Sequence, residues 1–136
     1  MSKESNPPKT IPARIELIDN WHKNWDAALL MITNLGALDC LMIDEDGWLS
    51  ARQNLFVAYV GQKPIGFLCF RVQPQQRTAA TAQEESKPLL EASVDGSAID
   101  PAYDTKKISR QLLEAAMNRA LELRCQRFVG KSRVDV

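Results

Sequence analysis

The sequence predicts an α/β (α+β) domain in which helices flank a sheet, and three observations support this prediction. Hydrophobic residues alternate with other residues along 11–18, as expected for a half-buried strand. Two apolar runs, 55–60 and 65–72, flank a polar turn and predict a β-hairpin. Apolar residues recur every three or four positions after Thr105 and predict a long helix. Strands and helices therefore share one chain.

The composition limits the classes of function. The chain has 136 residues, of which 45% are hydrophobic and 25% charged, as is typical of one soluble domain with an apolar core. Seventeen basic and seventeen acidic residues cancel, which argues against nucleic acid and anionic membranes as partners. No apolar run reaches the length of a membrane span, so we expect a cytoplasmic protein. With one histidine and three widely spaced cysteines, we expect no metal centre.

Two segments look unsuited to a packed core. Residues 1–10 are polar and contain two adjacent prolines, so we expect a disordered leader there and a single domain over 11–136. Residues 73–88 are rich in glutamine, alanine and threonine and contain no apolar anchor. This composition predicts a flexible internal loop between two strands.

Two helices are expected between the first strand and the hairpin. Asp19 and Asn20 are suited to cap the first helix, and the apolar residues after them keep a helical spacing up to Gly36. That face comprises Trp21, Trp25, Ala28, Leu29, Ile32 and Leu35. Its two tryptophans predict packing against the sheet, with a small-molecule pocket as the alternative. A second short helix is expected within 37–50, where the apolar positions are Leu38, Leu41 and Met42.

The last third of the chain predicts strand, helix and strand. A strand is expected over 89–99, with Gly96 as a bulge or a point of close approach. Asp100-Pro101 ends this strand, and the long helix begins at Asp104-Thr105. A last short strand is expected over 127–130. The apolar face of the long helix comprises Ile108, Leu112, Leu113, Ala116, Met117, Ala120 and Leu121.

This order of elements resembles the front part of the GNAT acyltransferases, which transfer acyl groups from coenzyme A. The most specific stretch is Ile99–Leu113, IDPAYDTKKISRQLL. It is similar to the family's apolar residue, any residue and proline, then a basic, glycine-rich turn and Ile-Gly-x-x-Leu-Leu. The hairpin sequence Val60–Phe67, VGQKPIGF, resembles the family's second and third strands. The resemblance implies a mixed, mostly antiparallel GNAT-like sheet, truncated after its fifth strand.

The resemblance implies acetyl-CoA or coenzyme A as the cofactor. Backbone N–H groups and the helix dipole at the start of the long helix would favour its pyrophosphate. The implied cofactor-binding residues are Ile99, Lys106, Lys107, Ile108, Ser109 and Arg110. Three positions depart from the family pattern, because Asp104 replaces a basic residue and Lys107 and Ser109 replace glycines. These departures leave open whether coenzyme A still binds.

The resemblance also implies a carboxylate on the fourth strand that accepts the proton of an amine. Glu91 and Asp95 are the candidate catalytic residues, and their spacing places both on one face of the strand, where they could share a pocket if no bulge intervenes. The alternative is that both are ordinary solvent-facing strand residues. The tyrosine that often protonates the departing thiolate in the family has no counterpart here.

Two functions from different classes remain open. The first is an acyl-CoA-dependent N-acyltransferase, with full, weakened or lost activity. The second is a non-catalytic GNAT-fold binding or regulatory module that acts through protein partners. A third interpretation is an unrelated α+β fold with an accidental likeness. The sequence does not specify the acceptor, a small-molecule amine or a protein. The bare edge of the last strand predicts a homodimer.

Overall fold

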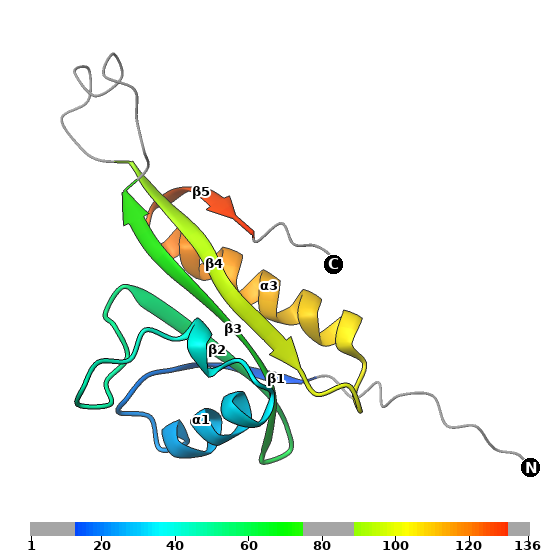
Figure 1. Ribbon diagram of the computed structural model, residues 1–136. Helices are drawn as coiled ribbons and strands as arrows, with labels where there is room; N and C mark the ends of the chain where they lie inside the picture. The colour runs from blue at the N-terminus through cyan, green and yellow to red at the C-terminus, as the bar shows by residue number, and fades with distance from the viewer. Residues whose placement is uncertain (1–12, 75–88, 131–136) are drawn as a thin grey trace, which may run out of the picture.

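The computed structural model describes residues 13–74 and 89–130, which form a five-stranded sheet with helices on both faces (Figure 1). The strands lie in the order β1-β2-β3-β4-β5. Neighbours among the first four are antiparallel, whereas β5 is parallel to β4. This confirms a mixed, mostly antiparallel sheet. The elements are β1 (Arg14–Ile18), α1 (Trp25–Asn34), the 3-10 helix η1 (Leu38–Cys40), β2 (Gln53–Val60), β3 (Lys63–Pro74), β4 (Leu90–Ile99), α3 (Thr105–Glu122) and β5 (Cys125–Val129).

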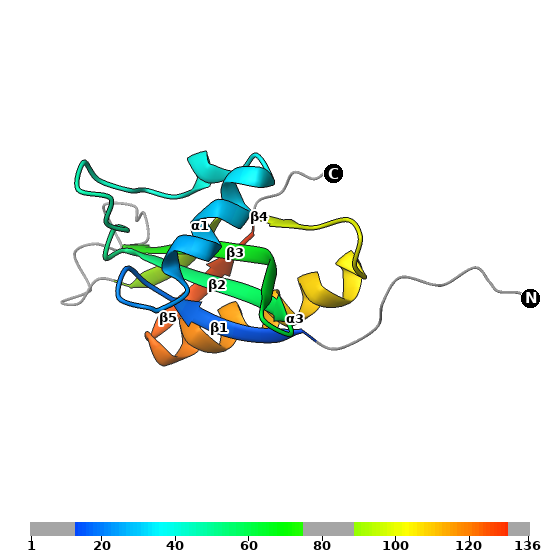
Figure 2. The same ribbon diagram turned by 90° about the horizontal axis from the view of Figure 1, so that it is seen from below.

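The core consists of two apolar layers, one on each face of the sheet. Figure 2 shows α1 and α3 on opposite sides of the strands. Side chains alternate along β2, so Leu55 and Val57 pack in the layer with α1, whereas Phe56 and Ala58 pack in the layer with α3. Among the described residues, the largest fully buried side chains are Tyr59, Phe67, Phe70, Ile18, Ile32, Leu55, Ile65, Ile108, Leu112, Val57 and Cys69.

The predicted hairpin is confirmed as β2 and β3, whereas the second short helix expected within 37–50 forms only as the 3-10 helix η1. Further along, an isolated bridge joins Ile43 and Leu49. The side chain of Asp44 accepts the N–H groups of Asp46 and Trp48 at 2.9 and 3.0 Å. Such a side-chain bond closes a turn and competes with helical pairing.

The first helix also begins later than expected, at Trp25 instead of near Trp21. Trp25 is buried, as expected for packing against the sheet, but Trp21 is 75% exposed and the packing prediction is wrong for it. Trp21 meets Trp48 edge-on at 4.8 Å between ring centroids. The reason is a turn, in which the Asp19 side chain accepts the N–H of Trp21 at 3.0 Å.

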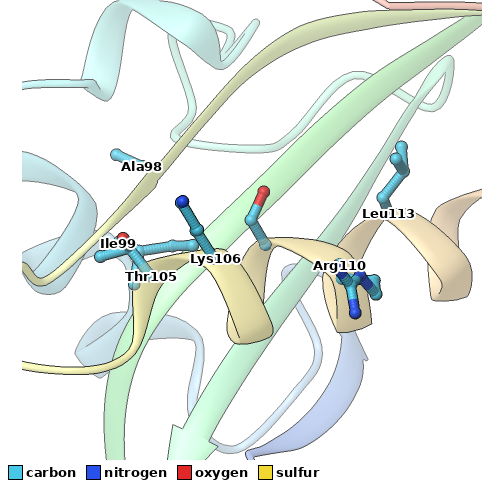
Figure 3. Close-up of a pocket in the computed structure, with 7 residues that line it drawn as sticks. Ala98, Ile99, Thr105, Lys106, Arg110 and Leu113 are labelled. Atoms are coloured by element: carbon cyan, nitrogen blue, oxygen red, sulfur yellow. The ribbon is translucent and has the colours of Figure 1, made fainter. Parts of the chain in front are cut away.

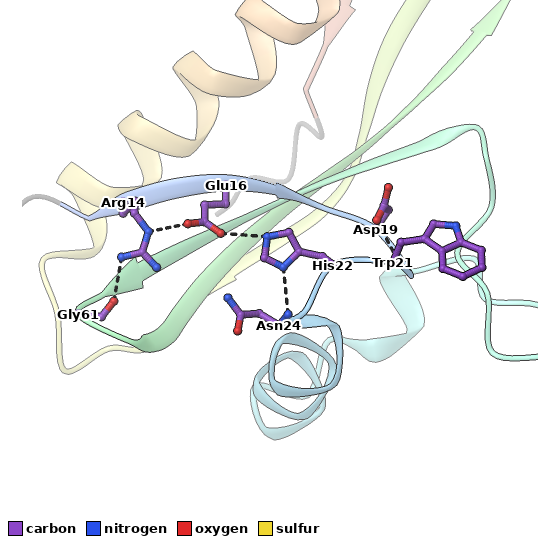
Figure 4. A network of polar contacts seen from close by, with 7 residues as sticks. All are labelled: Arg14, Glu16, Asp19, Trp21, His22, Asn24 and Gly61. Carbon is purple, nitrogen blue, oxygen red and sulfur yellow. Dashed lines mark hydrogen bonds and ion pairs between the residues drawn. The ribbon is translucent and has the colours of Figure 1, made fainter.

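A polar network joins β1 to the start of α1 (Figure 4). The carboxylate of Glu16 bonds to Nε of Arg14 at 2.6 Å and to Nε2 of His22 at 3.1 Å. The Arg14 hydrogen bond is the main reason why the pKa of Glu16 lies below its ordinary value. Nδ1 of His22 accepts the N–H of Asn24, which precedes the helix, at 3.0 Å.

Some expectations fall on residues outside the described ranges. These are the leader over 1–10 and residues 75–88 of the internal loop. Gln73 and Pro74, expected in that loop, belong to β3. The three cysteines, all within the described ranges, are free thiols. None of the helices formed by 13–74 and 89–130 has the length and apolarity needed to cross a membrane.

Candidate cofactor groove and active site

The candidate site begins where β4 separates from β5. Pairing between the two parallel strands ends at Ser93 and Val129. From Val94 to Ile99, β4 keeps its β3 partner but has no strand on its other side among the described residues. Its backbone N–H and C=O groups on that side are therefore available for a ligand.

A groove lies between this free edge of β4 and helix α3. Its outer part has a volume of about 550 Å³, and its inner part about 470 Å³. Both parts include Ser109 and Leu113, so we treat them as one and call it the β4–α3 groove. Figure 3 shows the outer part, which is lined by Ala98, Ile99, Thr105, Lys106, Ser109, Arg110 and Leu113. The inner part is lined by Cys40, Leu68, Val94, Asp95, Gly96, Ser97, Ser109, Leu113 and Gly130.

The groove contains four of the six cofactor-binding residues implied by the resemblance: Ile99, Lys106, Ser109 and Arg110. Ile108 is 1% exposed and belongs to the core under α3, and Lys107 does not line the groove. Helical geometry explains this division, because positions three and four apart share a face. The same spacing, continued from Lys106 and Arg110, could have identified Leu113, which the sequence interpretation missed.

The start of α3 combines positive charge with free backbone donors. Oδ1 of Asp104 accepts the N–H of Lys107 at 3.1 Å, so this residue caps the helix. The N–H groups of Thr105 and Lys106 make no hydrogen bond within the described part of the chain. The start of α3 therefore brings these two N–H donors together with Lys106, Arg110 and the Asp104 carboxylate. Free donors and positive charge at a helix N-terminus favour an anion, so we call this end of the groove the anion site.

A β-bulge interrupts β4 beside the inner part of the groove. Cys69 of β3 pairs with Gly96, whereas the next residue, Phe70, pairs with Val94, so Asp95 is the extra residue of the bulge. The sequence predicts a bulge or a close approach at Gly96, and the close approach is present. A Cβ at this position would lie 2.8 Å from Cβ of Cys40. The bulge sets Asp95 apart from the regular ladder.

The carboxylate of Asp95 is held by two neighbouring strands. Oδ2 accepts a hydrogen bond from Nε2 of Gln53 on β2 at 2.8 Å, and Oδ1 pairs with Nη2 of Arg71 on β3 at 3.3 Å. The Asp95 side chain is 14% exposed. Burial, and next the nearby Asp95 carboxylate, raise the pKa of Cys69. Asp95 therefore lines the inner part of the groove, with its partly buried carboxylate fixed toward β2 and β3.

Glu91 lies on the same face of β4 as Asp95 but in a different hollow. Oε2 of Glu91 accepts from Nε2 of Gln73 at 3.1 Å, and Gln73 shares a face of β3 with Arg71. Glu91 lines a hollow with Gln73, Pro74, Arg127 and Val129, none of which lines the β4–α3 groove. The two carboxylates share a face, as their spacing predicts, without sharing a pocket.

Comparisons with known proteins point to the same family as the motifs. The sequence model of the "Acetyltransferase (GNAT) family" matches residues 17–135. No curated protein matches the chain significantly. Among solved structures, ribosomal-protein-alanine N-acetyltransferase from Brucella melitensis biovar Abortus 2308 superposes with a TM-score of 0.64 at 16% identity. That alignment covers 88% of this chain and 79% of the other.

Two aminoglycoside acetyltransferases have the same fold. One, from an uncultured soil metagenomic sample, superposes with a TM-score of 0.68 at 9% identity, covering 93% of this chain and 83% of that chain. The other, AAC(6')-Iy in complex with CoA, gives 0.57 at 14% identity and covers 90% and 81%. At such identities the superpositions establish the fold alone, whereas the family match spans most of the sequence. The chain belongs to the GNAT acetyltransferase family.

Proposed function

We propose that the protein is an N-acetyltransferase that uses acetyl-CoA to acetylate a primary amine. The observation that carries this proposal is the β4–α3 groove, which runs from the start of α3 to Asp95. It joins an anion site, a free strand edge and a carboxylate in that order. Bound acetyl-CoA would supply an acetyl thioester that an amine can attack.

The residues of the groove fit the parts of coenzyme A. The N–H groups of Thr105 and Lys106, with the side chains of Lys106 and Arg110, suit the pyrophosphate. The free backbone edge from Ser97 to Ile99 suits the amide groups of the pantetheine arm. This order leaves the inner part of the groove, beside Asp95, for the acetyl group.

Asp95 is the residue best suited to accept the proton of the attacking amine. Its carboxylate is held by Gln53 and Arg71, and a fixed carboxylate beside the groove can act as a general base. A carboxylate has about four acceptor sites, so an amine N–H can bond to one not used by these partners. Glu91 lines another hollow and is the weaker candidate.

The nature of the acceptor is suggested only by the names of the structural neighbours. They are acetyltransferases of a ribosomal-protein alanine and of aminoglycosides. We therefore propose an α-amino group of a peptide or an amino group of an aminosugar as the first acceptors to test.

A second candidate function, a GNAT-fold binding module without catalysis, is favoured by one observation. The carboxylate of Asp104 adds a negative charge at the anion site. It also accepts the N–H of Lys107, so this donor is already engaged by the helix cap. In this alternative the fold is kept while coenzyme A is excluded by charge.

The experiment that separates these candidates measures binding and turnover independently. Isothermal titration with coenzyme A tests the groove, and mass spectrometry tests acetylation of an alanine-initiated peptide and of sisomicin. We expect binding in the wild type and in Asp95→Asn, and turnover only in the wild type. Loss of turnover in Glu91→Gln, with Asp95→Asn active, would reassign the base. Absence of coenzyme A binding in the wild type would favour the binding module.

A further inference from the structure

We infer that Gln53 is a positioning residue, which fixes the carboxylate of Asp95 in one orientation beside the β4–α3 groove. This inference rests on the proposed function, because it gives Gln53 a part in the reaction assigned to Asp95. Gln53 does not itself line the groove. It lies on β2, two strands away from Asp95 in the sheet.

The burial of Gln53 is the first argument. At 6% exposure it is the only polar residue among the buried residues of the described ranges. A buried amide lowers stability unless its donors and acceptor are satisfied. An apolar residue would fill this core position without such a requirement, so the presence of glutamine calls for an explanation.

The bonds of this amide give the second argument. Oε1 of Gln53 accepts the N–H of Met42 at 2.6 Å. Its Nε2 donates to the carbonyl of Cys40 at 3.1 Å and to Oδ2 of Asp95 at 2.8 Å. Both N–H groups and the carbonyl are thus in use, and the amide cannot rotate without losing bonds. The bonds to Cys40 and Met42 fix the amide, and the fixed amide then fixes Asp95.

The charged and titratable groups around Asp95 give the third argument. Arg71 approaches from β3, the buried thiol of Cys69 lies beside Arg71 in the same strand face, and Cys40 packs over the bulge. Glu91, on the same face of β4, is engaged by another glutamine. Among the described residues, Arg71 supplies charge to one oxygen of Asp95 and Gln53 supplies a neutral donor to the other. Without Gln53, Oδ2 loses that donor and the carboxylate can turn about its terminal bond.

The chain contains a matched control for this arrangement. Gln73 donates to Glu91 on the same sheet face at 3.1 Å, which repeats the glutamine–carboxylate pair away from the groove. Gln73→Met removes the same kind of hydrogen bond as Gln53→Met. It leaves Asp95 with both of its partners.

The primary test needs no turnover. Carbon NMR follows the signal of the Asp95 carboxyl at pH 7 in the wild type, Gln53→Met and Gln73→Met, with Asp95→Asn to assign the signal. We expect the signal to shift or broaden in Gln53→Met, because the carboxylate loses one of the two bonds that fix it, and to stay in place in Gln73→Met. Gln53→Glu, which has the same size but no amide donor, should change the signal as well. An unchanged Asp95 signal in both Gln53 variants would overturn the inference.

The second readout separates kcat from KM, measured with whichever of the two probe acceptors is acetylated. In Gln53→Met kcat should fall by about tenfold, while KM for acetyl-CoA stays near the wild-type value, and Gln73→Met should change neither. A fall of kcat together with a raised KM would assign Gln53 a structural role only. A wild type without coenzyme A binding would refute the proposed function, whereas the NMR signal of Asp95 would still decide the link between Gln53 and Asp95.

Discussion

Gly96 of β4 and Cys40 of η1 approach so closely that a Cβ atom at position 96 would lie 2.8 Å from the Cβ of Cys40. Gly96 follows the bulge residue Asp95, and both line the inner part of the groove with Cys40. The missing side chain lets η1 close over β4. The shape of the groove beside Asp95 therefore depends on this pair.

Replacement of this glycine should be costly. We expect Gly96→Ala to lower the free energy of unfolding by about 1–3 kcal/mol, because η1 must move away from the added methyl group. Chemical denaturation measures this loss. Gly130→Ala is the control, since a Cβ there meets nothing within 4 Å. Cys40→Gly in the Gly96→Ala background should restore much of the stability, and a double variant as unstable as Gly96→Ala would contradict the account.

Two substitutions at Asp104 separate its capping role from its charge. Asp104→Asn keeps an acceptor for the N–H of Lys107 and removes the negative charge from the anion site. We expect coenzyme A to bind about two- to fivefold more tightly to it, the usual size of a charge effect at a helix terminus. Asp104→Ala should also lose about 1 kcal/mol of stability with the cap. Titration calorimetry and thermal unfolding measure the two effects, and equal affinities in all three proteins would remove Asp104 from the anion site.

Lys106 should contribute directly to cofactor affinity. We expect Lys106→Ala to weaken coenzyme A binding by about tenfold, because a charge-assisted hydrogen bond to a phosphate is lost. The salt dependence of the binding constant should also become weaker. Lys23→Ala removes an exposed lysine before α1 and serves as the control. If both variants bind alike at every salt concentration, the anion site lies elsewhere.

The Glu16 network predicts a contribution to stability that depends on pH. The hydrogen bond from Arg14 lowers the pKa of Glu16 from its ordinary 4.5, so the folded state favours the carboxylate. This contribution is present above the unfolded pKa and is lost as the pH falls through the lower, folded pKa. Glu16→Gln should therefore reduce stability near pH 7, by up to about 1 kcal/mol, and much less near pH 3. Urea denaturation at both values checks this, and an equal loss at both would contradict it.

The homodimer expected from the sequence remains a prediction. The structure adds a specific surface for its test: Leu113, Met117 and Leu121 follow one another at helical spacing on α3 and are 40%, 46% and 70% exposed. Phe128 is less suited to mutation, because its ring packs on Phe70 at 6.0 Å. We expect a dimer by sedimentation at micromolar concentration, and Leu121→Asp should convert it to a monomer of unchanged helix content. A monomeric wild type would refute the expectation.

The sequence predicts the sheet and the long helix well, because their patterns are local. Alternation in 11–18 and the polar turn before Ile65 each involve a few neighbouring residues. The structure of the segment 37–50 does not follow from a local pattern of this kind. Its backbone is shaped by the Asp44 turn and by the bond between Met42 and Gln53, which joins residues 11 positions apart in the sequence. Hydrophobic spacing contains no signal for such bonds.

The candidate site also has one part that the sequence predicts and one part that it does not. The positions of Lys106, Ser109 and Arg110 follow from helical geometry and the family pattern. The setting of Asp95 depends on three strands and a bulge, and a bulge changes which residue faces a neighbour. Gln53 has no motif around it. Its importance is visible only when the two ends of its amide are traced to Met42 and Asp95.

Amide NMR spectra recorded during a titration with coenzyme A decide whether the cofactor binds in the β4–α3 groove, because they locate the ligand as well as detect it. We expect signals from Ser97 to Ile99 and from Thr105 to Arg110 to shift in a saturable way, and those of Trp21 and Trp48 to stay in place. No shifts at millimolar coenzyme A, or shifts confined to residues outside the β4–α3 groove, would contradict this expectation.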